Sequence, residues 1–233
     1  MKGIFVMPPY QHQFVCLATS KKPGGRCIAG KTWGGQNHGN WIRPVSNRDH
    51  DSVSDLERRY ANGNYACLLD LTTSTFSGAQ NHRYQIENHV ICHPPQWSSA
   101  RRLLLDEIAE FEDRPEQLWD LTHHSRCGVN DRVPPDLLNA QRQTLFLIRP
   151  ERISVTVSAE SADWGDPRLK VRASFTYGGQ PYAFKVTDDV AEGHFLRLGS
   201  GTHHPQGITY FTVSLGDIDP NTGYAYKLVA GIL

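Results

Sequence analysis

The sequence lacks long hydrophobic runs and several motifs that mark large enzyme classes. No segment approaches the roughly 18 consecutive apolar residues of a transmembrane helix, so we expect no membrane contact. The chain also has no GxGxxG after a strand-like run, no HExxH and no GxSxG. These absences argue against dehydrogenases, zinc proteases and α/β-hydrolases. An enzyme whose signature residues are scattered along the chain stays open, although the sequence leans against an enzyme.

Cysteine is scarce, and its spacing carries no metal or disulfide signature. The five cysteines are an odd number and include no CxxC pair, so we expect reduced thiols and a cytoplasmic protein. Two histidines and a cysteine stand together in HHSRC (123–127). A zinc site needs four ligands at recognisable spacing, and only Cys92-His93 and His203-His204 offer more. We therefore expect no metal and no cofactor, and we interpret 123–127 as a polar loop or as the place of a histidine that contacts phosphate.

Acidic residues are absent from the first 48 positions, although the whole chain carries 24 Asp and Glu against 24 Lys and Arg. Residues 1–48 contain seven Lys or Arg, residues 49–125 contain six basic and 13 acidic residues, and residues 126–233 contain 11 of each. A net charge of zero therefore hides a basic first segment. The local field of that segment bears more directly on binding partners than the net charge does.

The hydrophobic pattern predicts a mainly β protein. Short alternating apolar runs bounded by Gly, Pro and Asn recur at 13–20, 26–33, 40–46, 65–76, 83–92, 144–160, 170–189, 209–218 and 224–233. Between them, 98–121 has apolar residues at helical spacing, a serine cap at Ser98 or Ser99 and a break at Pro115. This order favours two small β-barrels joined by a helical linker. The expected ranges are 1–97 for the first barrel, 98–141 for the linker and 142–233 for the second barrel.

Several sequence blocks resemble the bacterial family of dual OB-containing domain proteins. The blocks are CLATSKKPGGRCIAG, NWIRPVS, YQIEN, FxYxxxxYxxxVTD and SLG…YKLVAGIL, spread from about Phe14 to Leu233. The resemblance implies two OB-type folds, each a five-stranded Greek-key barrel. It also implies nucleic-acid binding, in a bacterial defence or conflict system, and it supplies no catalytic residues. The family-like polar or aromatic positions are Ser20, Lys21, Arg26, Trp41, Arg43, Thr187 and Asp188.

The basic first segment favours nucleic acid on chemical grounds as well. Single strands are bound by cations that follow the backbone and by aromatic faces on which bases stack. We expect phosphate contacts from the lysines and arginines, stacking on the tryptophans, and a phosphate or base-edge contact from Arg43, provided that the segment faces outward as one continuous surface. A solvated face, a core position for Trp41 and a turn role for Asp188 are the alternatives. The expected contact residues are Ser20, Lys21, Lys22, Arg26, Lys31, Trp33, Trp41, Arg43, Thr187 and Asp188.

Two further functions stay open on the sequence alone. An enzyme acting on nucleic acid or a nucleotide would hold phosphate with Arg26 or Arg43. Its general base would be one of three carboxylates, Asp70, Glu87 or Asp188. An adaptor or sensor subunit of a defence complex would hold a protein or a modified nucleotide instead, and the expected helix at 98–121 would offer a docking surface for a partner protein.

Overall fold

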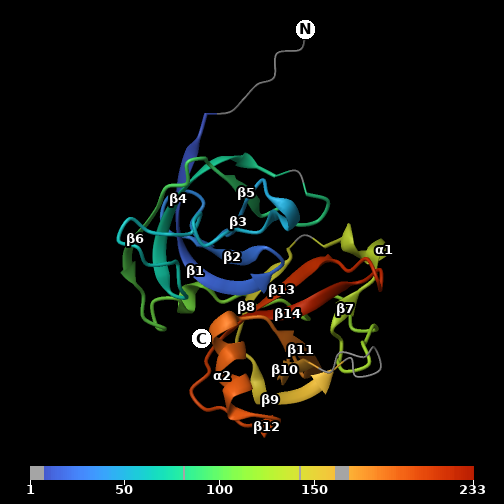
Figure 1. Ribbon diagram of the computed structural model, residues 1–233. Helices are drawn as coiled ribbons and strands as arrows, with labels where there is room; N and C mark the ends of the chain where they lie inside the picture. Colours follow the sequence, from blue (N-terminus) through green and yellow to red (C-terminus); the bar gives the residue numbers. More distant parts are fainter. Residues whose placement is uncertain (1–7, 81, 142, 161–167) are drawn as a thin grey trace. The chain divides into compact units, whose positions relative to one another are not determined.

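The computed structural model describes residues 8–80, 82–141, 143–160 and 168–233 (Figure 1). The chain divides into two compact units, Met1–Ile108 and Ala109–Leu233. Both units are built mainly from β-strands, so the predicted fold class is confirmed. In the described part of the chain, no helix is both long enough and apolar enough to cross a membrane.

The first unit contains a closed barrel of five strands. Hydrogen bonds join the strands in the order β1-β2-β3-β5-β4, and β4 pairs back to β1. Strand β1 closes the barrel because its two ends have different partners: Tyr10–Val15 pair with β4 and Phe14–Lys22 pair with β2. The β3–β5 pair is parallel and its neighbours are antiparallel. The strands are β1 (Tyr10–Lys22), β2 (Gly25–Thr32), β3 (Trp41–Val45), β4 (Asp70–Ala79) and β5 (Asn88–Ile91).

Alternating apolar residues fill this barrel. Successive side chains of a strand point to opposite faces of the sheet, so every second residue faces the interior. Phe14 and Cys16 of β1 are fully buried there, and burial raises the pKa of the Cys16 thiol. The other members of this core are Ile28, Ile42, Val53, Tyr60, Ala66, Phe76, Ile91 and Trp97.

Residues 98–121 do not form the predicted helix. Trp97–Arg102 form β6, which pairs antiparallel with β4, and only a short 3-10 turn, η2 (Ala109–Phe111), follows. Strand β4 offers backbone hydrogen-bonding groups along its edge, and β6 satisfies them. The apolar residues at helical spacing are nevertheless buried at Leu103, Ile108, Phe111 and Leu118. Residues 98–108 belong to the first unit and residues 109–141 to the second.

The second unit repeats the strand order of the first, with one strand split in two. Its sheet runs β9-β10-β11-β14-β13-β8, and the β11–β14 pair is parallel, as β3–β5 is. Only Arg149-Pro150 separates β8 (Leu145–Ile148) from β9. Strand β8 pairs with β13, and β9 pairs with β10. Together these two strands take the place of β1 in the first unit, which pairs with β4 at one end and with β2 at the other. The strands are β9 (Glu151–Glu160), β10 (Arg168–Tyr177), β11 (Gln180–Val186), β13 (Phe211–Ile218) and β14 (Ala225–Ile232).

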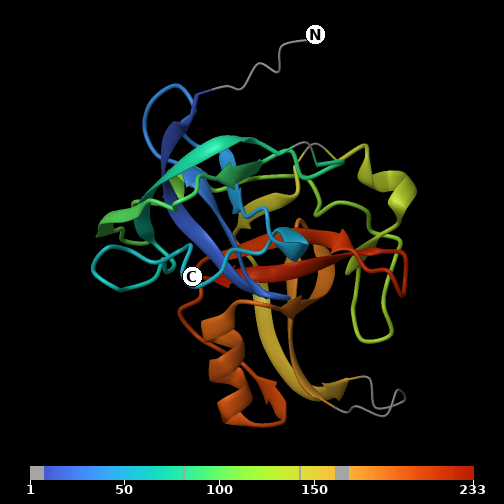
Figure 2. The ribbon, with the colours of Figure 1, turned by 45° about the horizontal axis from the view of Figure 1, so that its top comes forward.

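Helix α2 (Asp189–Leu198) connects the third strand of this second sheet to the rest of the unit. It follows β11 directly and lies beside β9 and β10, as the orange helix in Figure 2 shows. Strand β12 extends the sheet at β9, and β7 pairs with β14. The remaining elements are η1 (Asp49–Asp51), β7 (Arg132–Val133), α1 (Pro135–Leu138) and β12 (Gly201–His203).

Candidate nucleic-acid interface

Three cations of the basic first segment lie together at the turn between β1 and β2. Lys21 and Lys22 end β1, and Lys21 pairs with Arg26 of β2 across the turn. Lys21 is exposed, Lys22 and Arg26 are half-buried, and the preceding Ser20 is buried. The loop between the first two strands of OB folds is one of the loops that bind oligonucleotides. This turn therefore keeps three of the predicted cations together.

Lys31, Trp33 and Trp41 lie at the other end of β2. Arg26 and Thr32 are six residue steps apart on this strand, which spans about 20 Å at roughly 3.3 Å per residue. Lys31 is buried, and its ammonium nitrogen is 5.2 Å from the centroid of the Trp41 ring. The Trp33 ring is half-buried and lies 5.8 Å from His38. The structure thus brings Lys31 and Trp41 together but separates them from the cations at the turn.

Arg43 is held in a buried ion pair. Its Nη2 is 3.0 Å from Oε1 of Glu87, and only 2% and 5% of the two side chains are exposed. Its Nη1 also donates to Oδ1 of Asn88 at 3.3 Å, across the parallel β3–β5 pair. The expectation of one continuous outward surface is therefore wrong at Lys31 and Arg43, because both side chains are buried. Glu87 neutralises Arg43, which gives this carboxylate a structural role.

The letters of residues 25–32, GRCIAGKT, match the P-loop pattern GxxxxGKT, but their structure does not. A P-loop is a glycine-rich loop that leads into a helix, whereas these residues form strand β2 between β1 and β3. The Thr32 hydroxyl donates to the carbonyl oxygen of Asn37. A Cβ on Gly30 would lie 2.0 Å from the carbonyl oxygen of Val15. This glycine therefore allows close approach of two strands rather than of a phosphate.

The other two candidate carboxylates also stabilise the fold. Asp70 lies at the start of β4, where it binds Arg102 at 3.0 Å and accepts hydrogen bonds from Tyr60 Oη at 3.2 Å and from the Cys67 backbone N–H at 3.0 Å. Asp188 is the N-cap of α2. These contacts account for both carboxylates without a catalytic role.

Thr187 and Asp188 are both engaged at the junction of β11 and α2. Asp188 accepts from the N–H groups of Val190 at 3.0 Å and Ala191 at 3.1 Å, and its second oxygen accepts from Ile232 at 2.9 Å. Burial raises the pKa of Asp188, and these backbone hydrogen bonds oppose that shift. The Thr187 hydroxyl donates to the carbonyl oxygen of Val229. The alternative from the sequence was a turn role for Asp188, and the structure gives it another local role, as the residue that caps α2.

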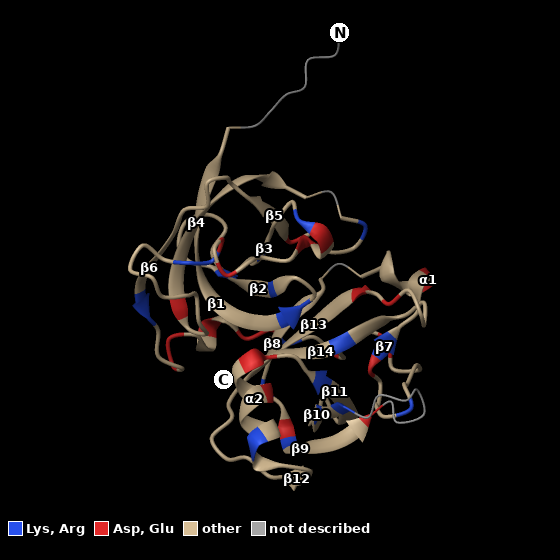
Figure 3. Ribbon diagram, in the orientation of Figure 1, with Lys and Arg blue, Asp and Glu red and all other residues tan. Residues whose placement is uncertain are grey.

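The second unit carries a basic pocket that sequence reasoning missed. Arg172 of β10 lies opposite Lys185 of β11, and Lys170 stands two residues before Arg172 on the same outward face. Blue segments lie side by side on these strands in Figure 3. The pocket has a volume of about 530 Å³ and is called the β10–β11 pocket below. Its charged lining residues are Arg126, Arg132, Lys170, Arg172, Lys185, Lys227, Asp131, Glu160 and Asp219.

Carboxylates neutralise Arg172 at the base of the β10–β11 pocket. The guanidinium binds Glu160 through Nε at 3.1 Å and Nη2 at 3.0 Å, and its Nη1 is 3.3 Å from Asp131 Oδ2. The same Nη1 donates to the carbonyl oxygen of Ala183 at 3.0 Å. A guanidinium forms such multiple contacts because its donors are fixed in one plane. Arg172 is thus a fixed structural cation whose charge is balanced within the unit.

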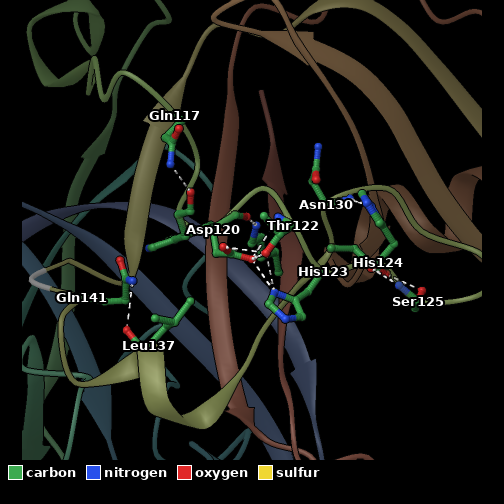
Figure 4. A network of polar contacts seen from close by, with 12 residues as sticks. Gln117, Asp120, Thr122, His123, His124, Ser125, Asn130, Leu137 and Gln141 are labelled. Atoms are coloured by element: carbon green, nitrogen blue, oxygen red, sulfur yellow. Dashed lines mark hydrogen bonds and ion pairs between the residues drawn. The ribbon is translucent and has the colours of Figure 1, made fainter.

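Segment 125–132 forms one wall of the pocket, and polar contacts tie it and the preceding histidines down (Figure 4). The Ser125 backbone N–H and hydroxyl both donate to Asp131, each at 2.6 Å. The Asn130 N–H donates to His124 Nδ1 at 2.8 Å, and its side-chain amide donates to the Pro181 carbonyl oxygen at 2.9 Å. His123 Nδ1 lies 2.7 Å from Asp120. Segment 123–127 is therefore a polar loop, one of the two interpretations open from the sequence.

Two more cations at the pocket are engaged by neighbouring groups. The Lys227 ammonium donates to the carbonyl oxygen of Asp120, and burial lowers the pKa of Lys227 to about 8. The Arg132 guanidinium lies over the Tyr224 ring at 4.2 Å, an arrangement that anchors the loop between β13 and β14. These contacts shape the pocket walls and hold them in place.

Lys170 and Lys185 differ from the other pocket cations. Among the described residues, no ion pair joins either ammonium to a carboxylate. Burial lowers the pKa of Lys185, and the positive charge of Lys170 lowers it further, while Glu192 and Glu160 act in the opposite direction. A partly buried cation beside a second cation is a place where a bound anion is favoured. These two lysines are the strongest candidate anion contacts in the described part of the second unit.

Metal binding finds no support in the part of the chain that the structure describes, where no group of three or more His, Cys, Asp and Glu side chains could hold an ion. The signal for the basic pocket was present in the sequence as Lys170 and Arg172 at alternate positions of a strand, followed by Lys185 on the next. A count of 11 basic and 11 acidic residues over 126–233 concealed it.

One comparison with known proteins identifies a family for the chain. No curated protein and no solved structure matches the chain significantly. One family model does match, over residues 12–232, and it describes a dual OB-containing domain. Because this match covers nearly the whole chain and each unit has the strand order found here, the chain belongs to the dual OB-containing domain family.

Proposed function

We propose that the chain is a nucleic-acid-binding module that prefers single strands, and that the β10–β11 pocket is its main contact surface. OB folds bind oligonucleotides on the face of their second and third strands and on the adjoining loops. In the second unit these strands are β10 and β11, which supply Lys170, Arg172 and Lys185. The observation that carries the proposal is the pair of neighbouring lysines, Lys170 and Lys185, neither of which forms an ion pair with a described carboxylate.

Aromatic and polar groups complete the proposed surface. Tyr226 of β14 is half-buried and lines the pocket, and a base can stack on a tyrosine ring. The loop between the fourth and fifth strands contributes Asp219 and Thr222. This loop is the second of the two that bind ligands in OB folds. Strand face, loop and aromatic ring therefore lie around one basic pocket.

The turn between β1 and β2 is proposed as a second contact surface. Lys21, Lys22 and Arg26 lie together there, at the loop between the first and second strands of the first barrel. Trp33 and Trp41 stay stacking candidates at the opposite end of β2. Each stacked base contributes about 1–3 kcal/mol. The first unit would add affinity in this proposal, while the second unit supplies the main anion site.

Fluorescence anisotropy of labelled single strands tests the proposal. DNA and RNA oligonucleotides of mixed sequence are titrated at several salt concentrations. Binding weakens as salt rises, with a slope of about −0.7 for each phosphate neutralised. The Lys170→Gln/Lys185→Gln variant is expected to reduce the magnitude of that slope by about 1.4.

A matched variant controls for net charge. Arg152→Gln/Arg197→Gln removes two exposed cations of the same unit outside the pocket, and we expect its slope to equal that of the unmodified chain. Circular dichroism checks that both variants fold. Salt-independent binding, or equal losses in the two variants, would contradict the proposed surface.

A role in a bacterial defence or conflict system, which the family resemblance implies, is part of the proposal. It predicts that cells expressing the chain with its genomic neighbours reduce plaque formation by phage. The pocket variant Lys170→Gln/Lys185→Gln should lose that protection while the Arg152→Gln/Arg197→Gln variant keeps it. Equal protection by both variants and the unmodified chain would show that the defence role does not depend on nucleic-acid binding at this pocket.

A further inference from the structure

We propose that the β10–β11 pocket binds a phosphomonoester, either the terminal phosphate of a strand or that of a free nucleotide, in preference to the diesters along a strand. The inference rests on the proposed function and makes its ligand more specific. It follows from three properties of the pocket. Two of its lysines form no ion pair with a described carboxylate, carboxylates lie in the same lining, and the volume is that of a small-molecule site.

The charge of the pocket favours a dianion, because six Lys and Arg side chains and three Asp and Glu side chains line it, a formal excess of three positive charges. Arg172 is balanced by Glu160 and Asp131, and the Lys227 ammonium is bound to a carbonyl oxygen. Lys170 and Lys185 then present two positive charges that no described carboxylate pairs with. A phosphomonoester carries a charge of about −1.5 to −2 at neutral pH, whereas each internal diester carries only one negative charge. Two adjacent ammonium groups therefore discriminate in favour of the monoester.

The carboxylates disfavour a continuous run of phosphates. A protein that follows the backbone of a single strand uses a groove lined by cations along its length. Here Asp131, Glu160 and Asp219 also line the pocket. Arg172 offsets only one of the two charges of Asp131 and Glu160, so the carboxylates keep a net negative charge that repels a phosphate placed beside them. A lining that mixes lysines with carboxylates suits one anionic group better than a chain of them.

The walls of the pocket limit what can enter it. Strands β10, β11 and β14 supply lining residues on one side, and segment 125–132 supplies another wall, held by the contacts of Asp131 and Asn130. A volume of about 530 Å³ lies within the range typical of small-molecule sites, roughly 300–1,000 Å³. Tyr226 offers a ring for the base or sugar next to the phosphate. One nucleotide with its terminal phosphate fits this description.

Matched oligonucleotides provide the test. Four single strands of identical sequence are compared by anisotropy: a 5′-phosphate against a 5′-hydroxyl, and a 3′-phosphate against a 3′-hydroxyl, each labelled at the other end. We expect one of the two phosphorylated ends to bind at least about tenfold more tightly than its hydroxyl partner. Lys185→Gln should abolish that difference, and Arg197→Gln should preserve it.

Competition distinguishes the possible sources of the phosphate. Adenosine and uridine monophosphates are added to displace the phosphorylated strand, and inorganic phosphate is added at the same concentration. Stronger displacement by the nucleotides identifies a nucleotide site. Equal displacement by inorganic phosphate identifies a site for the phosphate group alone, which also supports the inference. Failure of every monophosphate to compete overturns it.

The outcomes separate this inference from the proposed function. Salt-dependent binding with equal affinity for phosphorylated and hydroxyl ends overturns the inference and leaves the proposed function standing. If no strand binds, the proposed function is wrong. Isothermal titration with adenosine and uridine monophosphates then decides the inference: binding that Lys185→Gln removes supports it, and absence of binding overturns it.

Discussion

The two units place a cation at the same junction of their barrels and use it differently. At the parallel β3–β5 pair, Arg43 is buried against Glu87 and Asn88. At the parallel β11–β14 pair, Lys185 lies opposite Leu228, with Lys170 as a charged neighbour. The first arrangement neutralises its charge inside the fold, whereas the second presents it to a pocket. Local pairing, rather than the number of basic residues along a segment, therefore decides whether a cation is neutralised inside the fold or lines a pocket.

Loss of the buried pair in the first unit gives the largest expected effect. Arg43→Met leaves the Glu87 carboxylate buried without its partner, which costs about 3–5 kcal/mol of unfolding free energy. Urea denaturation measures this loss. The double variant Arg43→Met/Glu87→Leu removes both charges and should recover much of it. A stable Arg43→Met protein that has lost nucleic-acid binding would show that Arg43 contacts the ligand and would remove the contrast between the units.

The second largest effect is expected from a substitution at Gly128, in the wall of the β10–β11 pocket. A Cβ on Gly128 would lie 1.9 Å from Oδ2 of Asp131, so Gly128→Ala must displace the carboxylate that binds Arg172 and Ser125. We expect a stability loss of about 1–3 kcal/mol and a weaker preference for phosphorylated ends. Gly78→Ala is the control, because its Cβ would meet no atom within 4 Å. Unchanged end preference in folded Gly128→Ala protein would show that this wall does not shape the site.

The turn of the first unit gives a smaller effect on binding. Lys21→Gln/Lys22→Gln removes two cations near the surface, where counterions screen their field within about 10 Å at 0.1 M salt. We expect a loss of roughly twofold to fivefold in strand affinity. The preference for a phosphorylated end should stay the same. A larger loss than that of Lys170→Gln/Lys185→Gln, measured by the same anisotropy titration, would reverse the ranking of the two surfaces.

Acid pH should weaken the first unit through His89. Burial, and then the charge of His12, lower the pKa of His89 from 6.5 to about 4, while Glu87 opposes the shift. Between about pH 6.5 and pH 4 the unfolded chain binds a proton that the folded barrel does not, so stability falls as the pH falls. Thermal melting at pH 7.5 and pH 5 should show a smaller difference in His89→Gln than in the unmodified chain. An equal difference in both would assign the acid sensitivity to other groups.

The sequence predicted the strands better than the contacts between them. The alternating run at 170–189 contains two paired strands, β10 and β11, and the turn between them has positive φ at Gly178 and Gly179, with Tyr177 paired to Gln180. Turn residues and alternation are local properties, and local properties can be read from the chain. The helix expected at 98–121 failed because pairing with a distant strand, β4, determined the conformation of residues 97–102.

The site was predicted less well because tertiary contacts assemble it. The sequence predicts Arg43 as an outward cation, but in the structure it is buried against Glu87, which is 44 positions away along the chain. The P-loop letters at 25–32 occur in a strand, where Gly30 serves close packing. The lining of the β10–β11 pocket comes from residues within 125–132, from Glu160, and from residues within 170–185 and 219–228. Only folding brings these segments together, so a charge count along the chain could not reveal them.

Photocrosslinking of a single strand to the full chain, followed by mass spectrometry of the peptides, tests the central claim most directly. The strand carries a 5′- or 3′-phosphate and a photoreactive base next to it. We expect the adducts to map to the lining of the β10–β11 pocket, with Tyr226 the foremost site, and to disappear in Lys170→Gln/Lys185→Gln. Adducts confined to Trp33, Trp41 or the turn between β1 and β2 would contradict the account and return the binding site to the first unit.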